Sequence, residues 1–258
     1  MKTLDLNADI GEAEDANGIA AERAILPNIS SANIACGGHR GDAVSMRRTV
    51  KAAIHYGVQI GAHPAYPDRE NFGRKSMQLG QDINPDTLRV SLKAQIQSLI
   101  DIAASEGALV TYVKPHGALY NDAVTSAAHA NLIAEVIASL DLAFMGAPRS
   151  EMGRAAKRRG LRFIAEGFID RRYTDDGHLQ SRAIEGAVIK TLSDRLKQAA
   201  SLAAQHRVKT ATGQWLTVEC QSLCLHGDSA DAVSTARLAR EALEALGITI
   251  QAFGGVHA

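Results

Sequence analysis

Polar side chains stand at the ends of successive apolar stretches of this chain. The series is Asn7, Asp9 and Glu12; Asn33 and His39; His63; Lys114 and His116; Glu166 and Asp170; His226 and Asp228. One such histidine alone is more often a hydrogen-bonded structural residue than a functional one. Several histidines, a lysine and several carboxylates at corresponding positions instead indicate one shared site. Their chemistry suits proton transfer and the stabilisation of negative charge on oxygen.

The segment VKPHGALYN, residues 113–121, places Lys114 and His116 on either side of a proline. A lysine beside an imidazole suits oxyanion stabilisation combined with proton transfer. We expect mutual repulsion and partial burial to lower the pKa of both groups, which favours a neutral His116 that acts as a base. The alternative is that Lys114 pairs with a carboxylate such as Glu166 and only neutralises the site.

A second segment, EGFIDRRYTDDGHLQSR, residues 166–182, combines carboxylates with arginines. Carboxylate and guanidinium groups together suit a small zwitterionic or carboxylate substrate, and Arg74 in DRENFGRKS offers a second carboxylate clamp. Each arginine alone is more often part of a surface ion pair. The catalytic candidates are therefore Asp9, Lys114, His116, Glu166 and Asp170, and the substrate-binding candidates are Asn7, His39, His63, Arg74, Arg171, Arg182 and His226.

A divalent metal is an alternative use of the same side chains. Asp9, His39, His63, His116 and His226 are of the types that zinc and similar ions prefer as ligands. The sequence has no HExxH or comparably tight spacing, so the identity of any metal stays unknown.

Nucleotide and acyl-transfer motifs are absent from the sequence. The glycine-rich segment CGGHRGD, residues 36–42, is either an anion site before a helix or a plain tight turn. It does not match the dinucleotide pattern, and the chain contains no P-loop and no GxSxG motif. A site for ATP is therefore not visible in this chain.

Short apolar stretches alternate with helical patterns, and this alternation positions the polar series. We expect strands at residues 4–10, 31–36, 58–63, 109–116, 141–146, 161–168 and 222–228. We expect one helix from Asp42 to Gly57 and another that Asn84 caps and Gly107 ends; further helices should begin near Thr125, Ser150, Ser193 and Ser229, the last ending by Gly247.

Strand and helix thus alternate seven or eight times, which favours parallel strands with helical crossovers. A closed or nearly closed α/β barrel, formed by residues 1–258 as one domain, fits this length better than an open sheet. In such a barrel the carboxyl ends of the strands lie on one face, where the active sites of these folds form. The segments 64–84 and 167–186 exceed usual connection lengths and are predicted to be functional loops.

The bulk composition excludes several classes of partner. The chain has 28 basic and 28 acidic residues and no basic stripe, so we do not expect nucleic acid as a partner. No secretory signal and no apolar stretch long enough for a membrane span is visible, so we expect a cytoplasmic protein. The cysteines Cys36, Cys220 and Cys224 are interpreted as reduced thiols, mostly buried. The sequence leaves a homo-oligomer open.

Six motifs in order resemble the LamB/YcsF family, whose members are the A component of 5-oxoprolinase. They are LNADIGE; NIACGGHRGD; GAHPAYPD with NFGRKSM; VKPHGALYN; EGFIDRRYTDDGHLQSR; and CLHGD. The resemblance runs from residue 5 to about residue 250. It implies a variant barrel, seven-stranded and TIM-like, of the glycoside hydrolase and deacetylase superfamily. Ile169 and Lys75 depart from the usual pattern without removing a candidate catalytic group.

The resemblance also implies an activity: opening of the cyclic lactam 5-oxoproline (pyroglutamate) to glutamate with ATP hydrolysis, by this component together with the 5-oxoprolinase subunits B and C. ATP would then be consumed by the complex. Two other functions stay open. One is a stand-alone, metal-dependent amidohydrolase or deacetylase, which the superfamily and the histidines suggest. The other is a non-catalytic subunit that only binds a small carboxylic acid.

Overall fold

The computed structural model describes residues 2–227 and 231–254, in which strands and helices alternate. The strands are β1 Lys2–Ile10, β2 Ser31–Ala35, β3 Gln59–His63, β4 Val110–Val113, β5 Ala143–Gly146, β6 Phe163–Phe168, β7 Arg207–Lys209, β8 Trp215–Thr217, β9 Ser222–Leu225 and β10 Ile248–Ile250. The helices are α1 Ala16–Ile25, η1 Leu26–Asn28, α2 Ala43–Tyr56, α3 Pro85–Ser105, α4 Gly117–Thr125, α5 Ala127–Ala138, α6 Glu151–Arg158, α7 Leu192–Gln205 and α8 Ala232–Ala245.

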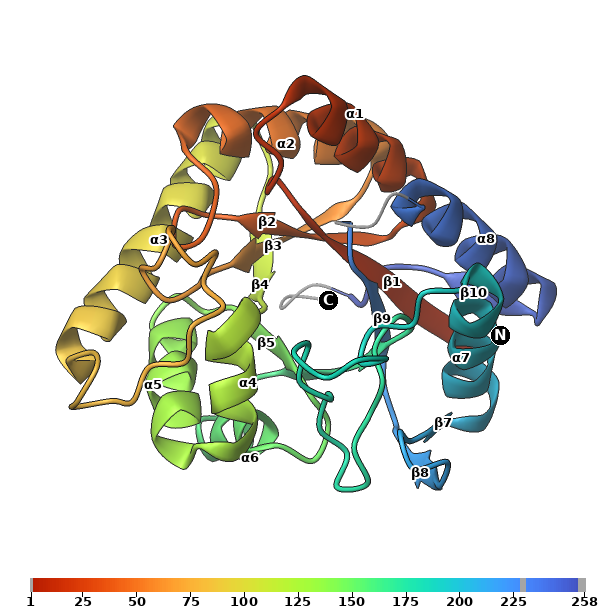
Figure 1. The fold of residues 1–258 in the computed structure, drawn as a ribbon. Helices are drawn as coiled ribbons and strands as arrows, with labels where there is room; N and C mark the ends of the chain where they lie inside the picture. The colour runs from red at the N-terminus through yellow and green to blue at the C-terminus, as the bar shows by residue number, and fades with distance from the viewer. Residues whose placement is uncertain (1, 228–230, 255–258) are drawn as a thin grey trace.

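Seven of these strands form a closed parallel barrel. They follow the order β1, β2, β3, β4, β5, β6 and β9, and β9 returns to pair with β1. The helices lie around the outside of the barrel (Figure 1). The predicted fold class, a seven-stranded variant of the β/α barrel, is confirmed.

Strand β1 shows how the barrel separates its two faces. Leu4, Leu6, Ala8 and Ile10 belong to the hydrophobic core between strands and helices. The alternate residues Asp5, Asn7 and Asp9 are also buried, but they bond to polar groups of neighbouring strands. Because successive side chains of a strand point to opposite faces, these polar groups must line the barrel interior. The interior is therefore a hydrogen-bonded polar network.

The helix boundaries follow local sequence signals. Asn84 caps α3 through hydrogen bonds to the backbone N–H groups of Asp86 and Thr87, and Gly107 adopts a positive φ just after this helix. The helices expected near Thr125, Ser150 and Ser193 begin at Ala127, Glu151 and Leu192.

The last predicted helix corresponds to α8, which begins at Ala232. The residues Ser229 and Asp228, named in the sequence predictions, lie outside the described residues.

Several elements were not predicted. Helices α1 and α4, the short hairpin of β7 and β8, and strand β10 all add to the expected pattern. Strand β10 extends the sheet by pairing with the beginning of β1. In the described part of the chain, no helix is both long and apolar enough to cross a membrane.

Candidate functional site

The carboxyl ends of the barrel strands surround a cavity of about 500 Å³. Nine of the predicted site residues line it: Asp9, His63, Arg74, Lys114, His116, Glu166, Arg171, Arg182 and His226. Asn7, His39 and Asp170 lie directly behind this lining, where they contact Glu166, His116 and His226 respectively. The structure thus brings all of the predicted site residues to one end of the barrel.

Lys114 follows strand β4 and occupies the centre of a buried ion network. Its Nζ lies 3.1 Å from Oδ1 of Asp9 and 2.8 Å from Oε1 of Glu166. Burial by itself lowers the pKa of Lys114, but the carboxylates of Asp9 and Glu166 raise it well above its usual value. The expectation that the pKa of Lys114 is lowered was therefore wrong, because a carboxylate lies on each side of the ammonium group.

Amide side chains inside the barrel orient these carboxylates. Asn33 Nδ2 donates to Asn7 Oδ1 at 2.7 Å and to Asp9 Oδ1 at 2.8 Å, while Asn7 Nδ2 donates to Glu166 Oε1 at 3.0 Å. Burial by itself raises the pKa of Asp9, but His63 and Lys114 lower it well below its usual value. Asp9 is consequently an anion held in a fixed direction.

His63 and His116 are oriented by backbone carbonyls. Nδ1 of His63 donates to the carbonyl oxygen of Lys114 at 2.7 Å, and Nε2 of His116 donates to that of Phe72 at 3.0 Å. Because a carbonyl only accepts, these contacts assign a proton to each donating nitrogen. The opposite nitrogens, Nε2 of His63 and Nδ1 of His116, face each other at 3.0 Å. A proton or a cation must lie between them to prevent the repulsion of two lone pairs.

The protonation of the two imidazoles differs. Burial, His63 and His39 lower the pKa of His116 to about 2, so His116 is neutral at pH 7, as predicted. Burial also disfavours a charged His63, but Asp9 raises the pKa of His63 above its usual value. His63 therefore carries the shared proton when no metal is bound.

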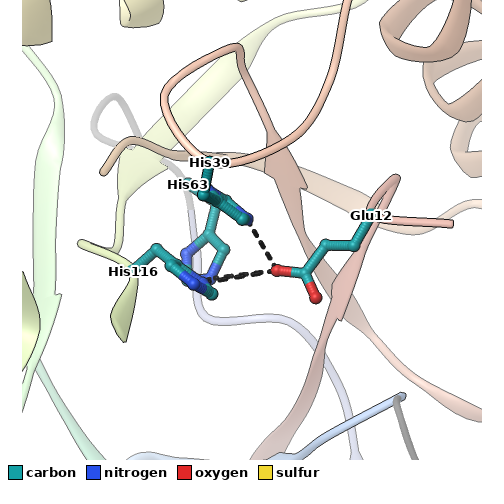
Figure 2. Close-up of side chains that lie close together, drawn as sticks. All are labelled: Glu12, His39, His63 and His116. Carbon is teal, nitrogen blue, oxygen red and sulfur yellow. Dashed lines mark hydrogen bonds and ion pairs between the residues drawn. The ribbon is translucent and has the colours of Figure 1, made fainter. Parts of the chain in front are cut away.

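Glu12 completes a cluster with three histidines, shown in Figure 2. Its Oε1 lies 2.7 Å from Nε2 of His39 and 3.3 Å from Nδ1 of His116. The His39 ring stacks on the His116 ring with 3.5 Å between centroids.

These residues fit a metal ion. One ligand atom from each of Glu12, His39, His63 and His116 lies within 4.8 Å of the others. The N–H contacts of His63 and His116 to carbonyls are the arrangement that orients metal-binding imidazoles. A second set consists of Asp9, Cys224 and His226, whose ligand atoms also lie within 4.8 Å of one another.

The arginines converge on the cavity from two loops. The Arg74 guanidinium lies over the Phe72 ring, 4.7 Å from its centroid. Arg171 donates from Nη2 to the carbonyl of Gln180 at 2.7 Å, and burial together with Arg182 lowers its pKa to about 10. Arg182 lines the same cavity. This arrangement provides positive charge for an anionic substrate group.

Asp170 is directed toward a histidine. Its carboxylate accepts from the backbone N–H of His226 at 3.0 Å and contacts Nδ1 of that ring at 2.8 Å. Burial raises the pKa of Asp170, but His226 lowers it, to about 2. Asp170 therefore orients His226, and Glu166 is the better placed of the two for direct contact with a ligand.

The glycine-rich segment forms a tightly packed turn. A Cβ at Gly38 would lie 2.4 Å from Oε1 of Gln95, and one at Gly41 would lie 2.4 Å from the carbonyl oxygen of Ala35. The carboxylate of Asp42 caps the following helix α2. Close packing thus explains these glycines.

Some lining residues were missed in the sequence analysis. Tyr120, Phe168 and Tyr173 line the cavity. The spacing of four between His116 and Tyr120 was a usable signal, because such residues share one face of a helix. Cys224 was interpreted as a buried thiol, and it is buried, but its Sγ lies 3.0 Å from Nζ of Lys114.

Comparisons with known proteins extend over nearly the whole chain. A crystal structure of the lactam utilization protein from Thermus thermophilus is 35% identical, with a TM-score of 0.89 over 98% of this chain and 100% of that one. A putative cellobiose-phosphate cleavage protein from Enterococcus faecalis is 13% identical, with a TM-score of 0.61 over 99% of this chain and 98% of that one. A family 4 carbohydrate esterase from Streptomyces lividans is 11% identical, with a TM-score of 0.52 over 98% of this chain and 93% of that one.

The last two similarities concern the fold alone. The model of the LamB/YcsF family matches residues 4–258. Together with the motifs at the barrel mouth, this match shows that the chain belongs to the LamB/YcsF family.

Proposed function

We propose that this chain is the A component of an ATP-dependent 5-oxoprolinase, which opens 5-oxoproline to L-glutamate together with subunits B and C. The observation that carries the proposal is the buried Lys114 between Asp9 and Glu166, at a cavity that also receives three arginines. A small lactam with one carboxylate matches this combination of groups. The similarity to a lactam utilization protein supports the same substrate class.

The chemistry explains why ATP is required. An amide is a poor electrophile, and phosphorylation of its oxygen creates a leaving group and an electrophilic carbon. Ring opening and ATP hydrolysis each consume one water and yield glutamate, ADP and phosphate. The absence of a P-loop in the sequence supports a division in which the partners handle the nucleotide.

The geometry supports a role for each group. The Lys114 ammonium stabilises negative charge on the lactam or phospholactam oxygen. His116 or Asp9 activates water, and Glu166, 2.8 Å from the lysine ammonium, assists protonation of the ring nitrogen. Arg74, Arg171 or Arg182 binds the substrate carboxylate.

Reconstitution tests the proposal. Glutamate and ADP formation from 5-oxoproline and ATP is measured with this chain alone, with subunits B and C alone, and with all three. We expect stoichiometric products only in the complete mixture. A complete mixture of folded subunits that forms no glutamate would refute the assignment.

A metal-dependent amidohydrolase is the second candidate function, and the Glu12, His39, His63 and His116 cluster favours it. A metal held there would supply Lewis-acid chemistry. Elemental analysis of the purified chain distinguishes the two candidates. About one equivalent of zinc, with hydrolysis of amides that needs no ATP and is lost on chelation, would favour the second.

A further inference from the structure

Three residues that line the cavity each have a buried polar atom without a hydrogen-bond partner among the described residues. These atoms are the hydroxyl of Tyr120, Oε2 of Glu166 and Nε of Arg171. Tyr120 is only 4% exposed and Glu166 only 1%. Buried polar groups are nearly always hydrogen-bonded in folded proteins. Unpaired polar groups on residues of one cavity therefore indicate hydrogen bonds to a ligand.

The unpaired hydroxyl distinguishes Tyr120 from other buried tyrosines. Tyr112 donates to Asn33 Oδ1 at 2.7 Å, and the hydroxyl of Tyr173 accepts from the backbone N–H of Phe168 at 2.8 Å. Tyr120 instead packs its ring edge-to-face on Phe168, with 5.8 Å between centroids. This contact fixes the direction of the ring while its hydroxyl stays unbonded within the described chain.

Glu166 bonds to the protein through one carboxylate oxygen, and its other oxygen has no partner among the described residues. Its Oε1 accepts from Lys114 and from Asn7, at 2.8 and 3.0 Å. These two contacts fix the carboxylate plane and leave Oε2 as an acceptor. After burial, Glu166 is the largest cause of the raised pKa of Tyr120, which places the two side chains in the same electrostatic environment.

A hydroxyl donor and a carboxylate acceptor in the lining of one cavity match the edge of a cis amide. In a five-membered lactam, N–H and C=O lie on the same side of the ring, whereas in an ordinary trans peptide they point in opposite directions. Tyr120 supplies the O–H for the carbonyl, and Glu166 supplies the oxygen for the N–H. Arg171, with its unpaired Nε, lines the same cavity and is available to a carboxylate.

We propose that Tyr120 and Oε2 of Glu166 together recognise the cis amide edge of an N-unsubstituted lactam. The inference rests on the proposed function and deepens it, because it assigns the residues that distinguish a lactam from other small carboxylates. It requires that the ring carry an N–H, since a ring oxygen would place lone pairs against the Glu166 carboxylate.

The test uses the complete complex with Tyr120→Phe and, as a matched control, Tyr66→Phe at a buried tyrosine outside the cavity lining. The first variant should lower kcat/KM for 5-oxoproline about tenfold, because the carbonyl loses one hydrogen bond. Its Tm should not fall, because the hydroxyl has no partner among the described residues. Tyr66→Phe should instead lower Tm and leave kcat/KM near the wild-type value, because the Tyr66 hydroxyl donates to Asp122 at 2.7 Å and the residue lies outside the cavity lining.

A lactone analogue, 5-oxotetrahydrofuran-2-carboxylate, tests the contribution of Glu166. It retains the carbonyl and replaces N–H by oxygen, so its inhibition constant should exceed the KM for the lactam at least about tenfold. The Tyr120→Phe substitution should weaken the binding of the lactone and of the lactam by the same factor, since both ligands lose the contact to their carbonyl.

The outcomes separate the two proposals. Unchanged kcat/KM in Tyr120→Phe, or a loss matched by a lower Tm, would overturn the assignment of Tyr120. A lactone that inhibits as tightly as the lactam binds would overturn that of Glu166. A wild-type complex that forms no glutamate would overturn the proposed function itself and, with it, the basis of this inference.

Discussion

The buried ion network at the barrel mouth sets the protonation of the proposed catalytic groups. Lys114 keeps its proton because Asp9 and Glu166 raise its pKa, so its proposed role is to stabilise negative charge and not to act as a base. His116 is neutral because burial and the neighbouring His63 and His39 lower its pKa to about 2. The imidazole and the ammonium therefore have separate roles.

If His116 rather than Asp9 is the group that activates water, replacement of His116 by Ala should lower turnover of the complete complex at least about a hundredfold. Glutamate formation under saturating substrate measures the effect. His55→Ala is the matched control, since His55 is exposed on α2 and lies outside the cavity lining. Near-native turnover of the His116 variant would exclude this residue as the base.

The sequence predicted which residues gather at the site, but not all of their pairings. Lys114 and His116 were recognised because they follow a strand and flank a proline. The pKa of Lys114 was misjudged because its carboxylate partners come from β1 and β6, far away in the sequence. Tyr120 was missed because its significance depends on the lack of a hydrogen-bond partner among the described residues, which only a structure reveals.

Strand β1 and helix α1 each contribute a buried carboxylate that holds the neighbouring segments in place. The β1 residue Asp5 is buried in the barrel interior, where its carboxylate accepts from Ser30, Ser31 and Ser222. On α1, Glu22 accepts the backbone N–H groups of Gly11, Glu12 and Ala13 at 2.9 to 3.0 Å. The helix thereby fixes the loop that directs Glu12 toward the histidines.

Asp5 should make stability depend on pH. Burial raises its pKa from 3.8 to about 6, so between these values the folded state binds more protons than the unfolded state. Its contribution to stability is therefore full below about pH 4 and is lost as the pH rises through 6. Asp5→Asn removes this dependence.

The free energy of unfolding of Asp5→Asn relative to wild type should thus improve by roughly 2–3 kcal/mol between pH 4 and pH 7. Urea denaturation at both pH values measures this difference, with the exposed Asp101→Asn as the control. A difference that does not change with pH would contradict the protonation of Asp5.

Glu22→Ala should lower the free energy of unfolding by about 2 kcal/mol or more, because three buried or half-buried N–H groups lose their acceptor. It should also lower turnover, since Glu12 loses its fixed position. Denaturation and glutamate assays on the same preparations provide both readouts. Glu244→Ala, an exposed ion-pair residue of α8, should change neither, and a fully active Glu22 variant would refute this positioning role.

At the scale of elements, the short apolar stretches were sufficient to predict all seven barrel strands. The same reasoning missed β7, β8 and β10, each three residues long, because such short strands have no clear periodicity. It also missed α1 and α4. Helix α4 begins directly after the segment VKPH, which ends the preceding strand, so the sequence shows no separate apolar pattern for this helix.

The closed barrel explains how a chain with dispersed motifs builds one site. Each motif follows a strand, and all barrel strands run parallel, so their carboxyl ends meet on one face. Closure of the barrel could not be predicted from periodicity. It depends on the pairing of the last barrel strand, β9, with the first, β1, and periodicity does not show which strands pair.

The most direct test of the central claim is glutamate and ADP formation by the complete complex that contains Lys114→Met, with Lys51→Met as the control. Lys51 is an exposed residue of α2 in a surface ion pair. If the chemistry takes place in this barrel, Lys114→Met should lower glutamate formation at least about a hundredfold even at saturating 5-oxoproline, while Lys51→Met stays near wild type. Full turnover of Lys114→Met at excess substrate would contradict the account and would identify the chain as a binding subunit.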